Sequence, residues 1–243
     1  MIEIQNQTLG SFAKGGEKKY RRPQSLPEQI AQQISQAILR GDYGPGDPIK
    51  EQNLADTFQV SRGPIREALR ILEKDGVVQI LPNRGAHITR LSSREVRDIF
   101  EIRAALSQLV IRYLCNARDE ELRQGFIAGA AGIAELAKGE DLLDEYVNES
   151  FKLSQMLANS SENMRLAEMM QSLARQTMRY TLLGLRRTDR RRKSAAIWQK
   201  LSTSVGNRDE KTSGRYILQL INDSMSAAIE ELEAEATSQT TPE

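Results

Sequence analysis

Residues 52–72, QNLADTFQVSRGPIREALRIL, constrain the fold more than any other stretch because they predict two short amphipathic helices in tandem. The second helix has an apolar face at the spacing of one helical side, formed by Ile65, Ala68, Leu69 and Leu72. A different face carries three arginines at four-residue spacing: Arg62, Arg66 and Arg70. Ser61 is placed to cap this helix, and Pro64 suits its first turn. The pattern indicates a helix-turn-helix that reads the major groove of DNA, with solvated arginines on an ordinary helix pair as the alternative.

A β-hairpin is predicted directly after the two helices. Two β-branched runs, at residues 77–81 and 86–89, flank the turn sequence PNRG. A hairpin in this position is the wing of a winged helix, and Arg84 and Gly85 at its tip would reach a phosphate or the minor groove. We predict that His87, the single histidine, is a strand residue, since one histidine makes no metal site.

The rest of the pattern is helical. A first helix is predicted at residues 26–40, before a loop at residues 41–48 that is rich in Gly and Pro. Six more are predicted at roughly 92–117, 119–138, 141–159, 163–186, 190–206 and 209–235. We therefore expect a mainly α fold, in which an N-terminal winged helix-turn-helix with a two-stranded wing is followed by an all-helical bundle. The expected divisions are a basic arm (1–24), the winged helix (25–90), the bundle (91–236) and a polar tail (237–243).

Composition excludes several classes of protein. Charged residues make up 28% of the 243 residues and aromatic residues 5%, as is typical of a folded, largely helical chain. The lone Cys115 excludes an internal disulfide and is predicted to be a buried helix residue, because the only histidine lies far away in sequence. No apolar run approaches the roughly 20 residues of a membrane span, and the N-terminus has no signal pattern, so we expect a cytoplasmic protein. No plausible pair of base and nucleophile is present, so we expect no enzymatic activity.

The charge is weakly asymmetric. Residues 1–90 carry 13 Lys or Arg and 10 Asp or Glu, whereas residues 91–243 carry 21 and 23. This sign suits an N-terminal part that binds DNA.

Two basic runs are open to more than one interpretation. The run KKYRRP at 18–23 either contacts phosphates or is a solvated tail, and RRTDRRRK at 186–193 is either solvated surface or a contact to DNA or to the winged helix.

Three motifs carry a resemblance to a known family: GDYGPGDPIKEQNLA, VSRGPIREALRILEKDGVV and PNRGAHIT. The chain resembles the GntR family of transcription regulators, whose motif V-S-R-(T/G)-P-(V/I)-R-E-A-L matches residues 60–69 at every position. The helical part, beginning with LSSREVRDIFEIRAAL at 91–106, is similar to the FCD effector-binding domain in its shorter, six-helix VanR-like form. The resemblance implies a sequence-specific DNA-binding regulator, most often a repressor, that acts as a homodimer on a pseudo-palindromic operator.

The resemblance also implies which residues contact DNA. Arg62 and Arg66 would bind DNA directly, while Gly63 and Pro64 let the helix N-terminus approach the backbone. Arginine forks suit guanine edges and phosphates, and helix N-termini favour phosphate. The full set that we expect at the DNA is Gln52, Ser61, Arg62, Gly63, Pro64, Arg66, Arg70, Arg84 and Gly85.

The helical part departs from its family at a metal site. Similar domains hold a divalent metal with an Asp, a His four residues later and two further His. The corresponding positions here are predicted to be Asn148, Lys152, Trp198 and Leu220. No set of metal ligands remains, so we expect neither a metal nor another cofactor.

A small organic acid is the ligand that we expect instead. Arg103 is the charged residue in an otherwise apolar helix row, and the resemblance makes it the pocket arginine of the family. Arg103 and Lys152 would bind the carboxylate, with Trp198 as an apolar wall and Asn148 and Leu220 nearby. The alternative is that Lys152 extends to solvent while Trp198 fills a collapsed cavity. The chain would then be a ligand-independent regulator.

Overall fold

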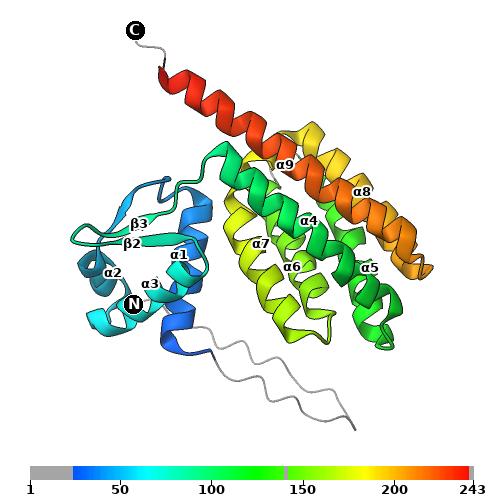
Figure 1. The fold of residues 1–243 in the computed structure, drawn as a ribbon, viewed down its shortest axis with the longest axis horizontal. Helices are drawn as coiled ribbons and strands as arrows, with labels where there is room; N and C mark the ends of the chain where they lie inside the picture. The colour runs from blue at the N-terminus through cyan, green and yellow to red at the C-terminus, as the bar shows by residue number, and fades with distance from the viewer. Residues whose placement is uncertain (1–23, 140–141, 241–243) are drawn as a thin grey trace.

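The structure is a computed structural model that describes residues 24–139 and 142–240 (Figure 1). Residues 1–23 of the predicted arm and the last three residues of the predicted tail lie outside the described residues. The prediction of a mainly α fold, with a winged helix-turn-helix followed by a helical bundle, is confirmed.

The winged helix contains three helices and a small sheet. The helices are α1 (Leu26–Arg40), α2 (Glu51–Phe58) and α3 (Arg62–Lys74). The strands are β1 (Pro48–Ile49), β2 (Val78–Leu81) and β3 (Gly85–Ile88). They form an antiparallel sheet in the order β1-β3-β2, so the two-stranded wing that we predicted has a third strand. The sequence pattern missed β1 because two residues in a Gly- and Pro-rich loop show no periodicity.

One apolar core holds the winged helix together. Ile30, Ile34 and Ile38 of α1 pack in the same buried cluster as Ile65 and Leu69 of α3. A capping box between Ser25 and Glu28 begins α1, and Gly41 in the left-handed conformation ends it. The apolar face of α3 is therefore turned inward, which leaves its arginine face in solvent.

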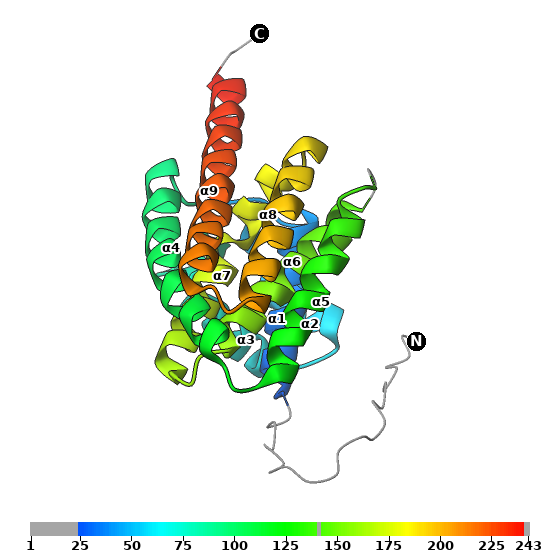
Figure 2. The same cartoon turned by 90° about the vertical axis from the view of Figure 1, so that its right-hand side faces the viewer.

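Six helices form the bundle among the described residues, as predicted. They are α4 (Ser93–Asn116), α5 (Glu120–Leu136), α6 (Leu143–Asn159), α7 (Met164–Leu185), α8 (Thr188–Gly206) and α9 (Glu210–Thr240). Helix α9 runs on to Thr240, so residues 237–240, which we predicted as tail, are helical. Figure 2 shows α9 alongside α4 and α8, and α9 also contacts α7. Between these helices lies a second apolar core, in which the Phe126 and Trp198 rings have centroids 6.1 Å apart.

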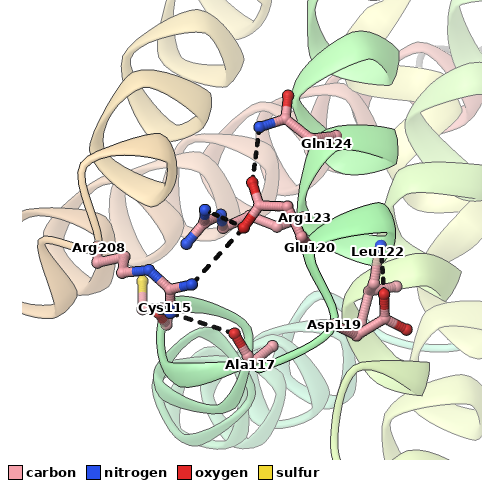
Figure 3. A network of polar contacts seen from close by, with 8 residues as sticks. All are labelled: Cys115, Ala117, Asp119, Glu120, Leu122, Arg123, Gln124 and Arg208. Carbon is pink, nitrogen blue, oxygen red and sulfur yellow. Dashed lines mark hydrogen bonds and ion pairs between the residues drawn. The ribbon is translucent and has the colours of Figure 1, made fainter.

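A polar network closes the end of α4 that is remote from the winged helix (Figure 3). Arg208 donates hydrogen bonds to the backbone oxygens of Cys115 and Ala117, at 3.2 and 3.1 Å. Glu120 lies between Arg208 and Arg123 and pairs with both. These contacts satisfy carbonyl groups that a helix end otherwise leaves without partners. Cys115 is buried in this region, as predicted.

Helix α7 is the bundle element that contacts the winged helix. Arg175 of α7 forms an ion pair with Asp75, the C-cap residue of α3, at 2.7 Å. The Tyr180 hydroxyl accepts a hydrogen bond from the backbone N–H of Leu91 at 3.1 Å. Gly76 has φ of +72°, and a Cβ there would lie 2.9 Å from the Gln176 side chain. The positive φ therefore favours glycine at this junction, and a Cβ there would also require the flexible Gln176 side chain to move.

Candidate functional site

Two arginines on the exposed face of α3 are held by side chains of α2. Arg62 donates to the side-chain oxygen of Gln52 through Nε at 2.8 Å, and also through Nη2. Arg66 forms an ion pair with Glu51 at 2.9 Å. Surface pairs of this kind contribute little free energy, so these arginines can exchange their partners for DNA at small cost. The structure thus brings together Gln52, Arg62 and Arg66, all three of them exposed.

The N-terminus of α3 is open. Ser61 occupies the N-cap position without a side-chain hydrogen bond to the helix, and the first turn of α3, described in full, contains no acidic residue. A Cβ at Gly63 would have its nearest neighbour at 3.8 Å, so nothing in the folded chain requires glycine there. Pro64 is half-buried in the first turn. Such an end suits the close approach of a phosphate group.

The wing tip projects beside α2. Arg84 and Gly85 are exposed in the β2–β3 turn, where Gly85 has φ of +79°. Figure 1 shows this turn and α2 on the side of the winged helix that faces away from the bundle.

His87 is a residue of β3, and its ring nitrogens lie within hydrogen-bonding distance of the backbone oxygens of Gly46 and Arg84. Arg70, further along α3, is exposed and pairs with Glu67. The DNA contacts of these residues stay predictions.

A cavity of about 50 Å³ lies within the bundle. Helices α4, α6, α7, α8 and α9 all contribute to its wall. Three of the five residues that we expected at an effector meet there, namely Arg103, Trp198 and Leu220. Ser150 and Ser154 of α6 line it as well.

Asn148 and Lys152 do not line this cavity, which corrects our expectation. They line a separate groove of about 670 Å³ between the winged helix and the bundle. Lys152 is exposed and pairs with Glu149 on its own helix. The residues of α6 that face the cavity at four-residue spacing are Ser150 and Ser154 instead. A shift of two residues rotates a side chain by about 200° around a helix, so the sequence comparison had selected the opposite face. Arg103 and Lys152 therefore do not face the same cavity in this structure.

Arg103 is a half-buried cation with a fully buried Nε, and it has no anionic partner among the described residues. Its Nη1 donates to the Thr177 hydroxyl at 3.0 Å and its Nη2 to the Ser154 hydroxyl at 3.4 Å. Its Nε is buried and lacks a partner, and within residues 24–139 and 142–240 no carboxylate forms an ion pair with it. Burial lowers the pKa of Arg103 to about 10, so the guanidinium is still charged at neutral pH. A charge in this position is costly unless an anion accompanies it.

The donor set of the cavity does not fit a divalent metal. In place of imidazoles and carboxylates, the wall presents serine hydroxyls, the Trp198 indole and the alkyl chain of Leu220. In the described part of the chain, no group of three or more His, Cys, Asp or Glu is arranged to hold a metal ion. Transition metals and zinc need such nitrogen, sulfur or carboxylate donors, so we derive no metal chemistry here.

Two arginines of a run that the sequence analysis expected either at the solvated surface or in contact with DNA or the winged helix are buried in the bundle. Arg190 and Arg191, from the basic run at 186–193, are exposed by only 8% and 1%. Arg191 donates to the backbone oxygens of Leu185 and Arg186, at 3.0 and 2.9 Å, and so closes the end of α7. The signal that we missed is spacing, because Arg191 lies seven residues, or two turns, before the buried Trp198 and so shares its helix face.

No helix in the described residues is both long enough and apolar enough to cross a membrane.

Comparison with known families matches both halves of the chain. Residues 26–88 match the family of bacterial regulatory proteins named gntR, and residues 98–223 match the FCD domain. The chain belongs to the GntR family and carries an FCD domain. The cavity described above lies within the FCD region.

Individual relatives are transcriptional regulators. The chain is 40% identical over 103 residues to the uncharacterized HTH-type transcriptional regulator YdhC of Bacillus subtilis, covering 42% of this chain and 46% of that protein. It is 35% identical over 89 residues to the HTH-type transcriptional repressor RspR of Escherichia coli, covering 37% and 39%. The chain thus spans less than half the length of these curated relatives. Among solved structures, E. coli McbR/YncC has a TM-score of 0.74 at 16% identity, covering 85% of this chain and 98% of that one, which shows a shared fold.

Proposed function

We propose that this GntR-family chain is a transcriptional regulator that binds an operator through α3 and the wing and binds a small organic acid in its bundle cavity. The observation that supports DNA binding is the pair Arg62 and Arg66, exposed on α3 and oriented by residues of α2. The observation that supports acid binding is the half-buried guanidinium of Arg103 in the cavity wall, which has no anionic partner in the described residues. Enzymatic activity has no comparable support, because the relatives are named as regulators.

The proposal includes a homodimer that represses transcription. One winged helix reads only a few base pairs, whereas two at a spacing of one DNA turn read a pseudo-palindrome with useful affinity. Repression is chosen because RspR and the gluconate operon repressor of Bacillus licheniformis carry that function in their names. Footprinting on the DNA that precedes its own reading frame tests the homodimer. We expect two protected half-sites about one helical turn apart, and a single unpaired site would contradict the dimer.

The acid site can be tested by replacing Arg103 with glutamine. We expect Arg103→Gln to abolish binding of short carboxylates, because the charge-assisted hydrogen bonds are lost while the side-chain length is roughly kept. Calorimetric titration with a panel of carboxylates and thermal shift of the same samples measure the effect, since a ligand of the native state raises the midpoint. Arg112→Gln, an exposed arginine of the same helix, is the control that keeps binding unchanged. Unchanged affinity in Arg103→Gln would contradict the site.

Helix α7 connects the cavity to the winged helix. Thr177 accepts the hydrogen bond from Arg103, and Arg175, two residues earlier, pairs with Asp75 at the end of α3. An acid that replaces Thr177 as the partner of Arg103 changes the packing of α7. Through Arg175, α7 contacts the end of α3, the helix that carries Arg62 and Arg66. This supports a coupling of about 1–3 kcal/mol between acid and operator binding.

Breaking the Arg175–Asp75 pair is expected to weaken that coupling. The Arg175 side chain is 31% exposed and that of Asp75 13%, so the pair is shielded more than a surface salt bridge. In Arg175→Gln, we expect operator affinity without acid to change by less than about threefold, while the change caused by acid falls toward none. Operator titrations with and without acid measure the ratio. Arg165→Gln, an exposed position on α7, should keep the full response. A full response in Arg175→Gln would place the coupling elsewhere.

A ligand-independent regulator is the second candidate. The observation that favours it is the size of the cavity, about 50 Å³, which holds only a few water-sized groups. The carboxylate panel separates the two candidates. A rise in midpoint with any small acid supports the responsive regulator, and the absence of any shift, together with intact operator binding, supports the second.

A further inference from the structure

The groove between the winged helix and the bundle is large enough for a metabolite. Its volume is about 670 Å³, against about 50 Å³ for the bundle cavity. Pockets that hold small molecules measure roughly 300–1,000 Å³ and often lie between domains. Helix α1 lines one side of the groove and α6 and α7 line the other, and Figure 1 shows α1 facing α7. A ligand in this groove would therefore contact both parts of the chain.

Arg179 of α7 lines the groove and has no partner. Within residues 24–139 and 142–240, its guanidinium makes no hydrogen bond and no ion pair. Its Nη1 is buried, whereas its Nε and Nη2 are not among the buried atoms. Nε and Nη2 form one edge of the guanidinium, and such an edge binds two oxygens of an anion at once. Burial lowers the pKa of Arg179, which is still a cation at neutral pH.

The surroundings of Arg179 carry an excess of positive charge. Arg90 and Arg186 lie close enough for their charges to act on that of Arg179, and so does Glu235. Glu235 has its ion pair with Arg186, at 3.9 Å. Three arginines and one glutamate leave this end of the groove positive. A doubly charged phosphate monoester is attracted there more strongly than a singly charged anion.

The groove is also rich in side-chain amides. Those that line it are Gln32 and Gln36 of α1, Asn148 and Gln155 of α6, and Gln176 of α7. The first four have no hydrogen-bond partner within the part of the chain that the structure describes, and the fifth donates to a serine of its own helix. An amide both donates and accepts hydrogen bonds, as a hydroxyl group does. These side chains therefore suit a ligand that carries several hydroxyl groups.

We infer that this groove binds a phosphorylated sugar, with the phosphate on Arg179 and the hydroxyl groups on the amides of α1 and α6. The site is separate from the bundle cavity and does not depend on the acid site proposed there. A ligand that contacts both the winged helix and the bundle favours the arrangement of the two parts in which both contacts are made.

Calorimetric titration of the full-length protein tests this inference. Glucose 6-phosphate and ribose 5-phosphate are compared with glucose, ribose and inorganic phosphate. We expect at least one ester to bind at least about tenfold more tightly than its own sugar and than inorganic phosphate, because only the ester reaches both the arginine and the amides. Arg179→Gln should weaken that ester by about tenfold or more. Arg165→Gln, exposed on α7 outside the groove, should leave its affinity unchanged.

Two glutamines of α1 provide a matched pair for the sugar end. Gln33 and Gln36 are both exposed, but only Gln36 lines the groove. We expect Gln36→Ala to weaken the ester by about twofold to tenfold and to leave inorganic phosphate unchanged, whereas Gln33→Ala should change neither. Arg103→Gln, in the bundle cavity, should bind the ester as the wild type does.

Four outcomes would overturn the inference. The first is that neither ester binds, and the second is that inorganic phosphate binds as tightly as the esters. The third is unchanged ester affinity in Arg179→Gln. The fourth is a loss in Arg103→Gln as large as that in Arg179→Gln, which would place the ester in the bundle cavity. None of these results bears on the response to carboxylates, so the acid-responsive part of the proposed function stands or fails separately.

Discussion

Replacing Arg62 and Arg66 together with alanine is expected to reduce operator affinity by at least about 30-fold. Each arginine that pairs with a guanine edge contributes about 1–3 kcal/mol of discrimination, or roughly fivefold to 150-fold in affinity. Both side chains are exposed and are oriented by Gln52 and Glu51 rather than by the core, so their loss leaves the fold intact. Electrophoretic mobility shift with the footprinted fragment measures the effect, and circular dichroism confirms that the protein is folded.

Two further variants test whether the loss of affinity is specific to the operator and to this face of α3. Arg70→Ala removes an exposed arginine further along α3, and we expect a smaller loss that is the same for operator and unrelated DNA, because a phosphate contact carries no sequence information. Arg112→Ala removes an exposed arginine of the bundle and should not change DNA binding. If the Arg62→Ala, Arg66→Ala double variant binds the operator as well as the wild type, α3 is not the reading helix.

Leu69→Ala is expected to destabilise the winged helix by about 2–5 kcal/mol. Leu69 is 1% exposed in the core formed by α1, α3 and the sheet, and truncation there loses burial and leaves a cavity. That core is separate from the core of the bundle. We therefore expect urea unfolding of the winged helix to shift to lower concentration while the bundle unfolds as before.

The single tryptophan makes the two parts distinguishable. Trp198 lies in the bundle core, so its fluorescence reports the bundle, whereas far-UV circular dichroism reports both parts. In Leu69→Ala, the dichroism transition should move and the fluorescence transition should stay. Leu26→Ala is the matched control, because Leu26 is 47% exposed in the same part, and its expected effect is within about 0.5 kcal/mol. Transitions that move together would show that the two cores unfold as one unit.

Patterns along a single helix were enough to predict most of the fold. The apolar face of α3 and the arginines opposite it follow from residue spacing, since 3.6 residues per turn assign each side chain to a face. The same reasoning located all six bundle helices. Residue spacing could not predict the two-residue strand β1, because a strand this short is defined by its pairing with β3 and not by its own residues.

The two candidate sites differ in the same way, because one lies in local motifs and the other is built from distant helices. The sequence by itself was enough to predict a DNA-facing set from Gln52 to Gly85, because those residues lie in short local motifs whose exposed face the neighbouring apolar residues define. It also determined that the histidines of a family metal site are absent. Only the tertiary structure decided what lines the cavity, since five helices from distant parts of the chain meet there. On α6 the cavity is lined by Ser150 and Ser154 rather than by Asn148 and Lys152. Arg190, from a run that the sequence analysis left open between solvated surface and a contact, is buried in the bundle. Helical periodicity relates residues within one helix, whereas the position of a face relative to other helices is set by packing.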